Sequence, residues 1–173
     1  TVMGYNLTKL RVLLVDDSKN MRMLVKTVLQ ALGIVNIKEA SDGSAAMKEL
    51  KASAIDIAIV DWVMEPTDGL EFVRQVRTAE DSPNPFLPII MMTGHTERAR
   101  IFTARDAGVT EFLAKPITAK TLLLRLSNII EHPRPYVRAK GYFGPDRRRR
   151  SEDYNGPERR GKAKVEVKQA EDA

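Results

Sequence analysis

Apolar residues along the first three quarters of the chain follow two spacings that alternate. Residues 11–15 form a short continuous apolar run that ends at two acids. From Ser18 to Leu32 the apolar residues recur with the spacing of one helix face, which predicts an amphipathic helix. Ser18 suits the N-cap of that helix, and Gly33 suits the position just past its end. The segment is therefore predicted to be a strand followed by a helix.

The same pair of patterns recurs up to residue 131, giving five repeats of strand then helix. Continuous apolar strands that alternate with helices predict a parallel sheet covered by helices on both faces, an α/β fold. The expected strands are 11–15, 36–40, 55–60, 87–92 and 111–114, and the expected helices are 18–32, 44–51, 69–79, 97–107 and 118–131.

Polar side chains follow the C-terminal ends of four of these strands. Asp16 and Asp17 follow the first strand, Asp61 the third, Thr93 the fourth and Lys115 the fifth. In such sheets the functional site lies at this edge. Three carboxylates in one cleft repel each other and need a cation, and an all-oxygen site suits Mg²⁺. A carboxylate can also attack phosphorus, and a cation and a hydroxyl can then hold the dianionic group. A structural cluster of ion pairs is the alternative, and it leaves the common placement unexplained.

Charge divides the chain near residue 132. Residues 1–132 hold 16 Lys+Arg and 16 Asp+Glu, whereas residues 133–173 hold 12 and 7 and carry the whole net charge of +5. After two prolines, the second part has few apolar residues, which predicts disorder in the absence of a ligand. The expected parts are an N-terminal arm (1–10), a folded domain (11–132), an arginine-rich ligand-binding tail (133–162) and a disordered C-terminus (163–173).

The composition of the chain indicates its cellular compartment. The chain has no cysteine, which fits a reducing cytoplasm, and its 43% of apolar residues suffice for a buried core. No apolar run approaches the roughly 20 residues that a membrane-spanning helix needs. We therefore expect a cytoplasmic protein without membrane insertion.

The tail contains an internal repeat. Residues 142–148 recur as residues 154–160 with five of seven positions identical, a pattern that charge alone does not require. Arginine can bind guanine or phosphate, tyrosine can stack, and an acid can read the guanine edge. Two such units suit cyclic di-GMP; an RNA- or DNA-binding arm and an inert solvated tail are the less favoured alternatives. The expected contacts are Tyr142, Asp146, Arg147, Arg148, Arg149, Arg150, Tyr154, Glu158, Arg159 and Arg160.

Over residues 11–131 the motifs together resemble the CheY-like receiver domains of two-component response regulators. This resemblance implies a flavodoxin-like sheet in the order 2-1-3-4-5 and a signalling protein rather than an enzyme, one that accepts a phosphoryl group from a histidine kinase. The motifs are Val15-Asp16-Asp17-Ser18, Val60-Asp61-Trp62-Val63-Met64, Asp68-Gly69, Met92-Thr93-Gly94 and Leu113-Ala114-Lys115-Pro116.

The resemblance also implies residue roles. Asp61 would be the phosphoacceptor, and Mg²⁺ would be held by Asp17, Asp16, Asp61 and the carbonyl of Val63. The phosphoryl oxygens would contact Thr93 and Lys115, with a cis bond between Lys115 and Pro116. Thr93 and Phe112 would form the switch pair, although Phe112 is equally well explained as a core aromatic. Glu65 departs from the family pattern, because an acid stands where proline usually follows the methionine.

A receiver joined to an arginine-rich tail further resembles the CheY-like cyclic di-GMP effectors, the Cle group. The implied role is adjustment of flagellar motor behaviour, with the motor switch protein as partner and a location at the flagellar base. Phosphorylation would then be either a second input or a vestige. The alternative is a phospho-activated receiver whose basic tail binds RNA, DNA or another anionic partner.

Overall fold

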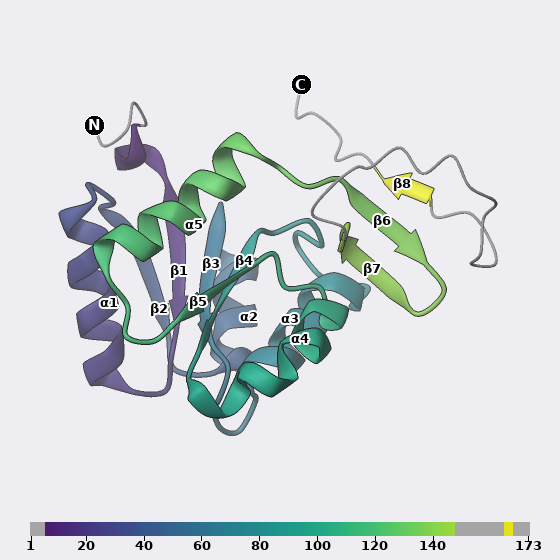
Figure 1. Cartoon of the computed structure of the whole chain (residues 1–173), viewed down its shortest axis with the longest axis horizontal. Coiled ribbons are helices and arrows are strands. Elements are labelled where there is room, and N and C mark those ends of the chain that lie inside the picture. Colours follow the sequence, from purple (N-terminus) through teal and green to yellow (C-terminus); the bar gives the residue numbers. More distant parts are fainter. Residues whose placement is uncertain (1–5, 148–164, 168–173) are drawn as a thin grey trace.

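The computed structural model describes residues 6–147 and 165–167 of the 173-residue chain. Its centre is a five-stranded parallel sheet in the order β2-β1-β3-β4-β5, which confirms the expected order (Figure 1). The strands are β1 (Arg11–Val15), β2 (Asn36–Ala40), β3 (Ile57–Asp61), β4 (Ile89–Thr93) and β5 (Glu111–Ala114).

Helices cover both faces of this sheet, as predicted. Along β1, Val12 and Leu14 pack on the side of α1 and α5, whereas Leu13 and Val15 pack on the side of α2, α3 and α4. Because both faces are buried, the central strands β1, β3 and β4 carry apolar residues at successive rather than alternate positions, up to the polar Asp61 and Thr93 that end β3 and β4. The helices are α1 (Lys19–Ala31), α2 (Gly43–Ala52), α3 (Gly69–Thr78), α4 (Ile101–Ala107) and α5 (Ala119–Glu131).

Local signals set most helix ends. The Ser18 side chain accepts a hydrogen bond from the backbone N–H of Met21, and Gly33 has the left-handed φ of 92° that favours glycine after a helix. One helix differs from its expected form. The segment predicted as a helix from residue 97 begins instead as a 3-10 helix, η2 (His95–Arg100), which leads directly into α4. A change from 3-10 to α-helical winding within one helical segment often marks a hinge.

The first part of the tail is an antiparallel hairpin, β6 (Tyr136–Ala139) and β7 (Tyr142–Pro145), connected through Gly141 with φ 74°. A short strand, β8 (Val165–Val167), pairs with the other edge of β6. The expected disorder therefore does not hold for residues 136–147, nor for residues 165–167 within the segment predicted as a disordered C-terminus. Figure 1 shows the hairpin beside α3 and α4, and both helices contact β7.

The physical reason is that the hairpin buries its few apolar residues against the domain. The ring centroid of Phe86 lies 5.1 Å from that of Tyr136 and 5.5 Å from that of Phe143. Val137 and Phe143 are buried. A segment too poor in apolar residues to fold alone thus folds on a surface that is already present.

The N-terminal arm is also tied to the domain. Its 3-10 turn, η1 (Leu7–Lys9), places Leu7 in the core beside α1 and α5. Among the described residues, no helix is both long and apolar enough to cross a membrane.

Candidate functional site

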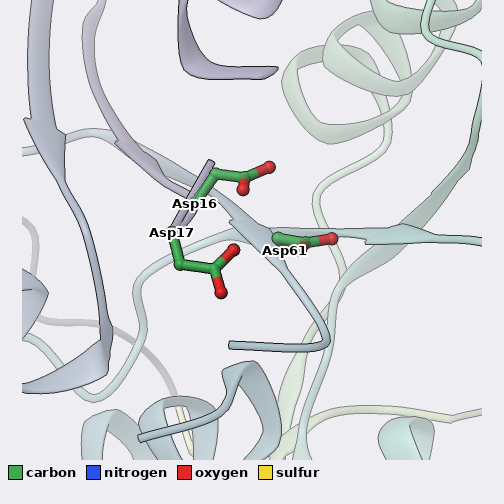
Figure 2. A group of neighbouring side chains, drawn as sticks. All are labelled: Asp16, Asp17 and Asp61. Atoms are coloured by element: carbon green, nitrogen blue, oxygen red, sulfur yellow. The ribbon is translucent and has the colours of Figure 1, made fainter. Parts of the chain in front are cut away.

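Three carboxylates meet at the C-terminal edge of the sheet. Asp61 is the last residue of β3, and Asp16 and Asp17 directly follow β1, its neighbour in the sheet. Oxygen atoms from all three lie within 4.8 Å of one another (Figure 2). Asp16 and Asp61 are buried, whereas Asp17 is exposed. The site thus has a buried floor and one side open to solvent.

A close turn fixes the backbone around Asp61. The N–H of Gly69 donates to the carbonyl of Trp62 at 2.9 Å, so α3 begins directly against the end of β3. A Cβ at Gly69 would lie 2.3 Å from the Asp61 carbonyl oxygen, so only glycine fits there. Asp68 caps the helix by accepting from the N–H of Glu71. The loop between β3 and α3 has a cis peptide bond between Glu65 and Pro66.

The electrostatics of Asp16 fit a bound cation. Burial raises the pKa of Asp16 to about 6, with the charge of Asp61 adding to the effect and the N–H of Ser18 opposing it. Its Oδ2 is buried and has no hydrogen-bond partner among the described residues. A buried oxygen without a donor, next to two more carboxylates, is the ligand environment that a hard divalent cation prefers. The residues present therefore fit Mg²⁺.

Lys115 supplies the positive charge of the site. Its Nζ lies 2.8 Å from Oδ1 of Asp61. Burial alone would lower the pKa of Lys115, but the hydrogen bond and charge of Asp61, with the charges of Asp16 and Glu97, raise it. Burial in turn raises the pKa of Asp61, and the Lys115 ammonium opposes that rise. The bond between Lys115 and Pro116 is cis, as expected.

Thr93 and Phe112, the expected switch pair, lie on the neighbouring strands β4 and β5. Thr93 is the last residue of β4 and is buried, and its carbonyl accepts from the backbone N–H of Lys115 at 2.9 Å. Phe112 is partly buried and packs against the core beneath α2, α3 and α4. Val63 is 59% exposed on the loop after β3. The switch role of the pair and the metal-binding role of the Val63 carbonyl remain predictions.

Two residues that the sequence did not single out also border the site. Glu97, in η2, is buried, and a Cβ at Gly94 would lie 3.0 Å from its Oε2. The guanidinium carbon of Arg100 lies 5.4 Å from the ring centroid of Trp62, the residue after Asp61. Both residues lie in the segment that directly follows β4. Their position just after a strand end was the one feature of the sequence that could have marked them as neighbours of the site. Because the segment was predicted as a regular helix, an acid in its first turn needed no further explanation.

The described part of the first tail repeat is engaged within the chain. Tyr142 donates its hydroxyl hydrogen to the carbonyl of Pro145 at 2.6 Å, and the Arg147 guanidinium carbon lies 4.7 Å from the Tyr142 ring centroid. Arg147 also pairs with Asp106 of α4, and Asp146 is buried. The other expected contacts lie outside the described residues: Arg148, Arg149, Arg150, Tyr154, Glu158, Arg159 and Arg160.

Comparison with known proteins agrees with this geometry. Residues 12–127 match the family described as the response regulator receiver domain. The chain is 37% identical over 122 residues to chemotaxis protein CheY-3 of Vibrio cholerae, covering 70% of this chain and 92% of that protein. It is 35% identical over 122 residues to chemotaxis protein CheY of Pseudomonas aeruginosa, covering 70% and 97%.

Solved structures give the same result. The structure of CheY4 of Vibrio cholerae superposes with a TM-score of 0.63 at 34% identity, covering 69% of this chain and 98% of that one. The receiver domain of NtrX from Brucella abortus superposes with a TM-score of 0.62 at 26% identity, covering 70% and 98%. With its sheet order and its strand-end carboxylates and lysine, this chain belongs to the family of response regulator receiver domains and is CheY-like.

Proposed function

We propose that this receiver accepts a phosphoryl group on Asp61, with Mg²⁺ held by Asp16, Asp17, Asp61 and the carbonyl of Val63. The observation that carries the proposal is the group of three carboxylates whose oxygens lie within 4.8 Å, with the Lys115 ammonium 2.8 Å from Asp61. When bound, Mg²⁺ would neutralise charge on the transferred group and on the carboxylates.

The residues of the chain perform the remaining steps. An Oδ atom of Asp61 attacks phosphorus and forms the new P–O bond, while the bond to the donor breaks and its electron pair leaves with the donor. Lys115 then shifts from the carboxylate to a phosphoryl oxygen, and the Thr93 hydroxyl donates to another. Phe112 would respond to the new position of Thr93. A histidine kinase is the donor that this chemistry suits.

Trp62 provides the test, because it is the single tryptophan of the chain and directly follows Asp61. With Mg²⁺ present, beryllofluoride as a phosphoryl mimic should change the Trp62 fluorescence in a saturable way. Asp61→Asn should abolish this change. Asp56→Asn is the matched control, since Asp56 pairs with Arg11 before β3 and should leave the response intact. Equal responses from wild type and Asp61→Asn would contradict the proposal.

We further propose that cyclic di-GMP binds the tail and that the liganded protein adjusts the flagellar motor through the motor switch protein, at the flagellar base. The +5 net charge of residues 133–173 and the repeat of Tyr, Gly-Pro, acid and Arg-Arg support this proposal. The packing of Arg147 on Tyr142 at 4.7 Å supports it too, because a stacked arginine and tyrosine present flat faces to a base.

Specific and nonspecific binding by the tail differ in a measurable way. Calorimetry of the full chain should show binding of cyclic di-GMP but not of GTP, cyclic di-AMP or a short RNA, at two salt concentrations. Replacing Arg147 and Arg148 together, or Arg159 and Arg160 together, should each weaken that binding strongly. A purely electrostatic tail would instead accept every polyanion and lose affinity steeply with salt. Equal binding of all four compounds would leave the nucleic-acid alternative as the explanation.

A further inference from the structure

The tail hairpin covers a buried arginine of the receiver. Arg77, in α3, is 3% exposed, and burial lowers its pKa. Its guanidinium donates to the carbonyl of Gly108 at 3.0 and 3.1 Å and to that of Pro85 at 2.9 Å. The Tyr136 ring of the hairpin stands over it, with 5.3 Å between guanidinium carbon and ring centroid. Without the hairpin, this guanidinium would lose its aromatic cover.

The same contacts hold the C-terminal end of α4. Gly108 ends this helix with a φ of 109°, and Arg77 binds its carbonyl. On the hairpin side, Gly144 packs so closely that a Cβ there would lie 3.2 Å from the Cα of Gly108. Arg147 pairs with Asp106 in the last turn of α4. The end of α4 is thus held between Arg77 and β7.

The segment leading into α4 borders the phosphoacceptor site. Glu97 is buried, and its Oε2 would lie 3.0 Å from a Cβ at Gly94, the residue between Thr93 and η2. The carbonyl of Thr93 accepts from the N–H of Lys115, and the charge of Glu97 helps to raise the pKa of Lys115. Arg100 lies over Trp62. Residues 95–107 therefore connect two places: η2 borders Asp61 and its lysine, and α4 ends under the hairpin. The change from 3-10 to α-helix within this segment gives it a point at which it can rewind.

We propose that the docked hairpin holds η2 and α4 in the arrangement that keeps the Glu97 carboxylate near Lys115, and so opposes phosphorylation of Asp61. The incoming phosphoryl group is a dianion that needs the Lys115 ammonium, and its charge repels the Glu97 carboxylate. Moving Glu97 away requires η2 to shift, and the hairpin restrains the helix that continues from η2. The hairpin is then an inhibitory element built from the tail.

Thermodynamic linkage makes the effect reciprocal. If docking of the hairpin weakens phosphoryl binding at Asp61, occupation of Asp61 must weaken docking by the same factor. Any ligand that draws Arg147 or Tyr142 away from the receiver would then favour phosphorylation. The inference rests on the proposed role of Asp61 as phosphoacceptor.

The experiment measures the affinity of the full chain for beryllofluoride with Mg²⁺ through Trp62 fluorescence. Asp106→Asn breaks an exposed ion pair and should tighten binding about two- to fivefold. Phe143→Ala removes a buried ring of the hairpin and should tighten it by about tenfold, within the usual range of allosteric coupling. Asp81→Asn is the matched control, because it breaks an exposed pair with Lys51 of α2, which involves neither α4 nor the hairpin, and should change nothing.

A double-mutant cycle with Glu97→Gln tests the proposed route. Glu97→Gln alone should tighten binding, and in its background Asp106→Asn should add less than in wild type. Hydrogen exchange of residues 136–145 should speed up when beryllofluoride binds. Wild-type affinity in Asp106→Asn, Phe143→Ala and Glu97→Gln would overturn the inference and leave the role of Asp61 standing. Absence of any response in wild type would overturn both.

Discussion

The ammonium of Lys115 reaches the carboxylate of Asp61, at 2.8 Å, across the width of β4, which lies between β3 and β5 in the sheet. The backbone makes this reach possible, since the N–H of Lys115 is held by the carbonyl of Thr93, at the end of β4. Lys115 is therefore fixed at its base by the sheet and at its tip by the carboxylate that it serves.

Removing the ammonium group of Lys115 should weaken binding of a phosphoryl mimic at Asp61. Lys115→Ala should lower the affinity for beryllofluoride by at least tenfold, because a charge-assisted hydrogen bond contributes about 1.5–3 kcal/mol. Lys120→Ala, an exposed lysine in the first turn of α5, is the control and should bind as wild type does. Unchanged affinity in Lys115→Ala would show that the lysine does not contact the bound group. Trp62 fluorescence provides the measurement.

Magnesium should stabilise the protein more as the pH rises through about 6. Burial raises the pKa of Asp16 to about 6 in the folded chain, so the folded state holds this proton more tightly than the unfolded chain does. The stability that this proton contributes is complete below about pH 4 and is lost as the pH rises through about 6. Mg²⁺ needs the ionised carboxylate, so its stabilising effect should grow over the same interval.

Denaturant unfolding with and without Mg²⁺, across that interval of pH, measures the effect directly. Ca²⁺ at equal ionic strength separates the geometric preference of the site from simple screening. A difference in unfolding free energy that stays constant with pH would contradict a role for Asp16 in holding the cation.

The pKa of Tyr142 should show whether the hairpin is docked on the receiver. Burial raises the pKa of Tyr142 to about 12, although the charges of Arg77 and Arg147 oppose the rise. Because the folded pKa lies above the unfolded value of about 10, the stability that this phenol contributes is present below pH 10 and is lost as the pH rises through about 12. NMR of ring-labelled tyrosine should show the raised value, with Tyr142→Phe identifying the signal. An ordinary titration near pH 10 would mean that the ring lies in water.

Cyclic di-GMP should compete with Asp106 for Arg147. If Arg147 contacts the nucleotide, breaking its pair with Asp106 removes a cost of binding, so Asp106→Asn should tighten cyclic di-GMP binding about two- to fivefold. Arg147→Ala should weaken it instead. Calorimetry of both variants, with Asp81→Asn as control, gives the comparison. Weaker binding by Asp106→Asn would show that the carboxylate assists the ligand rather than competing with it.

The receiver fold could be predicted from the sequence because each strand and helix is marked by residues within it or next to it. Strands β1, β3 and β4 are nearly continuous apolar runs, and β5 is a shorter one. Asp61, Thr93 and Lys115 come directly after such runs, so the edge that gathers them follows from parallel pairing. Helix ends were signalled in the same way, by Ser18 and Gly33. A site built from strand ends needs no knowledge of side-chain packing.

The hairpin could not be predicted in that way, because the surface it folds on is distant in sequence. The hydroxyl of Tyr136 donates to the carbonyl of Phe86, 50 residues earlier. The four-residue strands β6 and β7 carry few apolar side chains, and this low apolar content taken alone predicts disorder. The role of Glu97 was hidden for a related reason, since only the packing of η2 shows that the acid lies against the site.

The docking of β7 on Gly108 also has a consequence for how such proteins are recombined. The family match ends at residue 127, but the structure packed against the receiver continues through β7, which ends at Pro145. A tail grafted onto another receiver would keep its hairpin only if that receiver offered an aromatic ring at the place of Phe86, an arginine at that of Arg77 and a residue without a side chain at that of Gly108. Receiver and tail of this chain therefore form a matched pair, and exchange of either part alone would break the contacts between them.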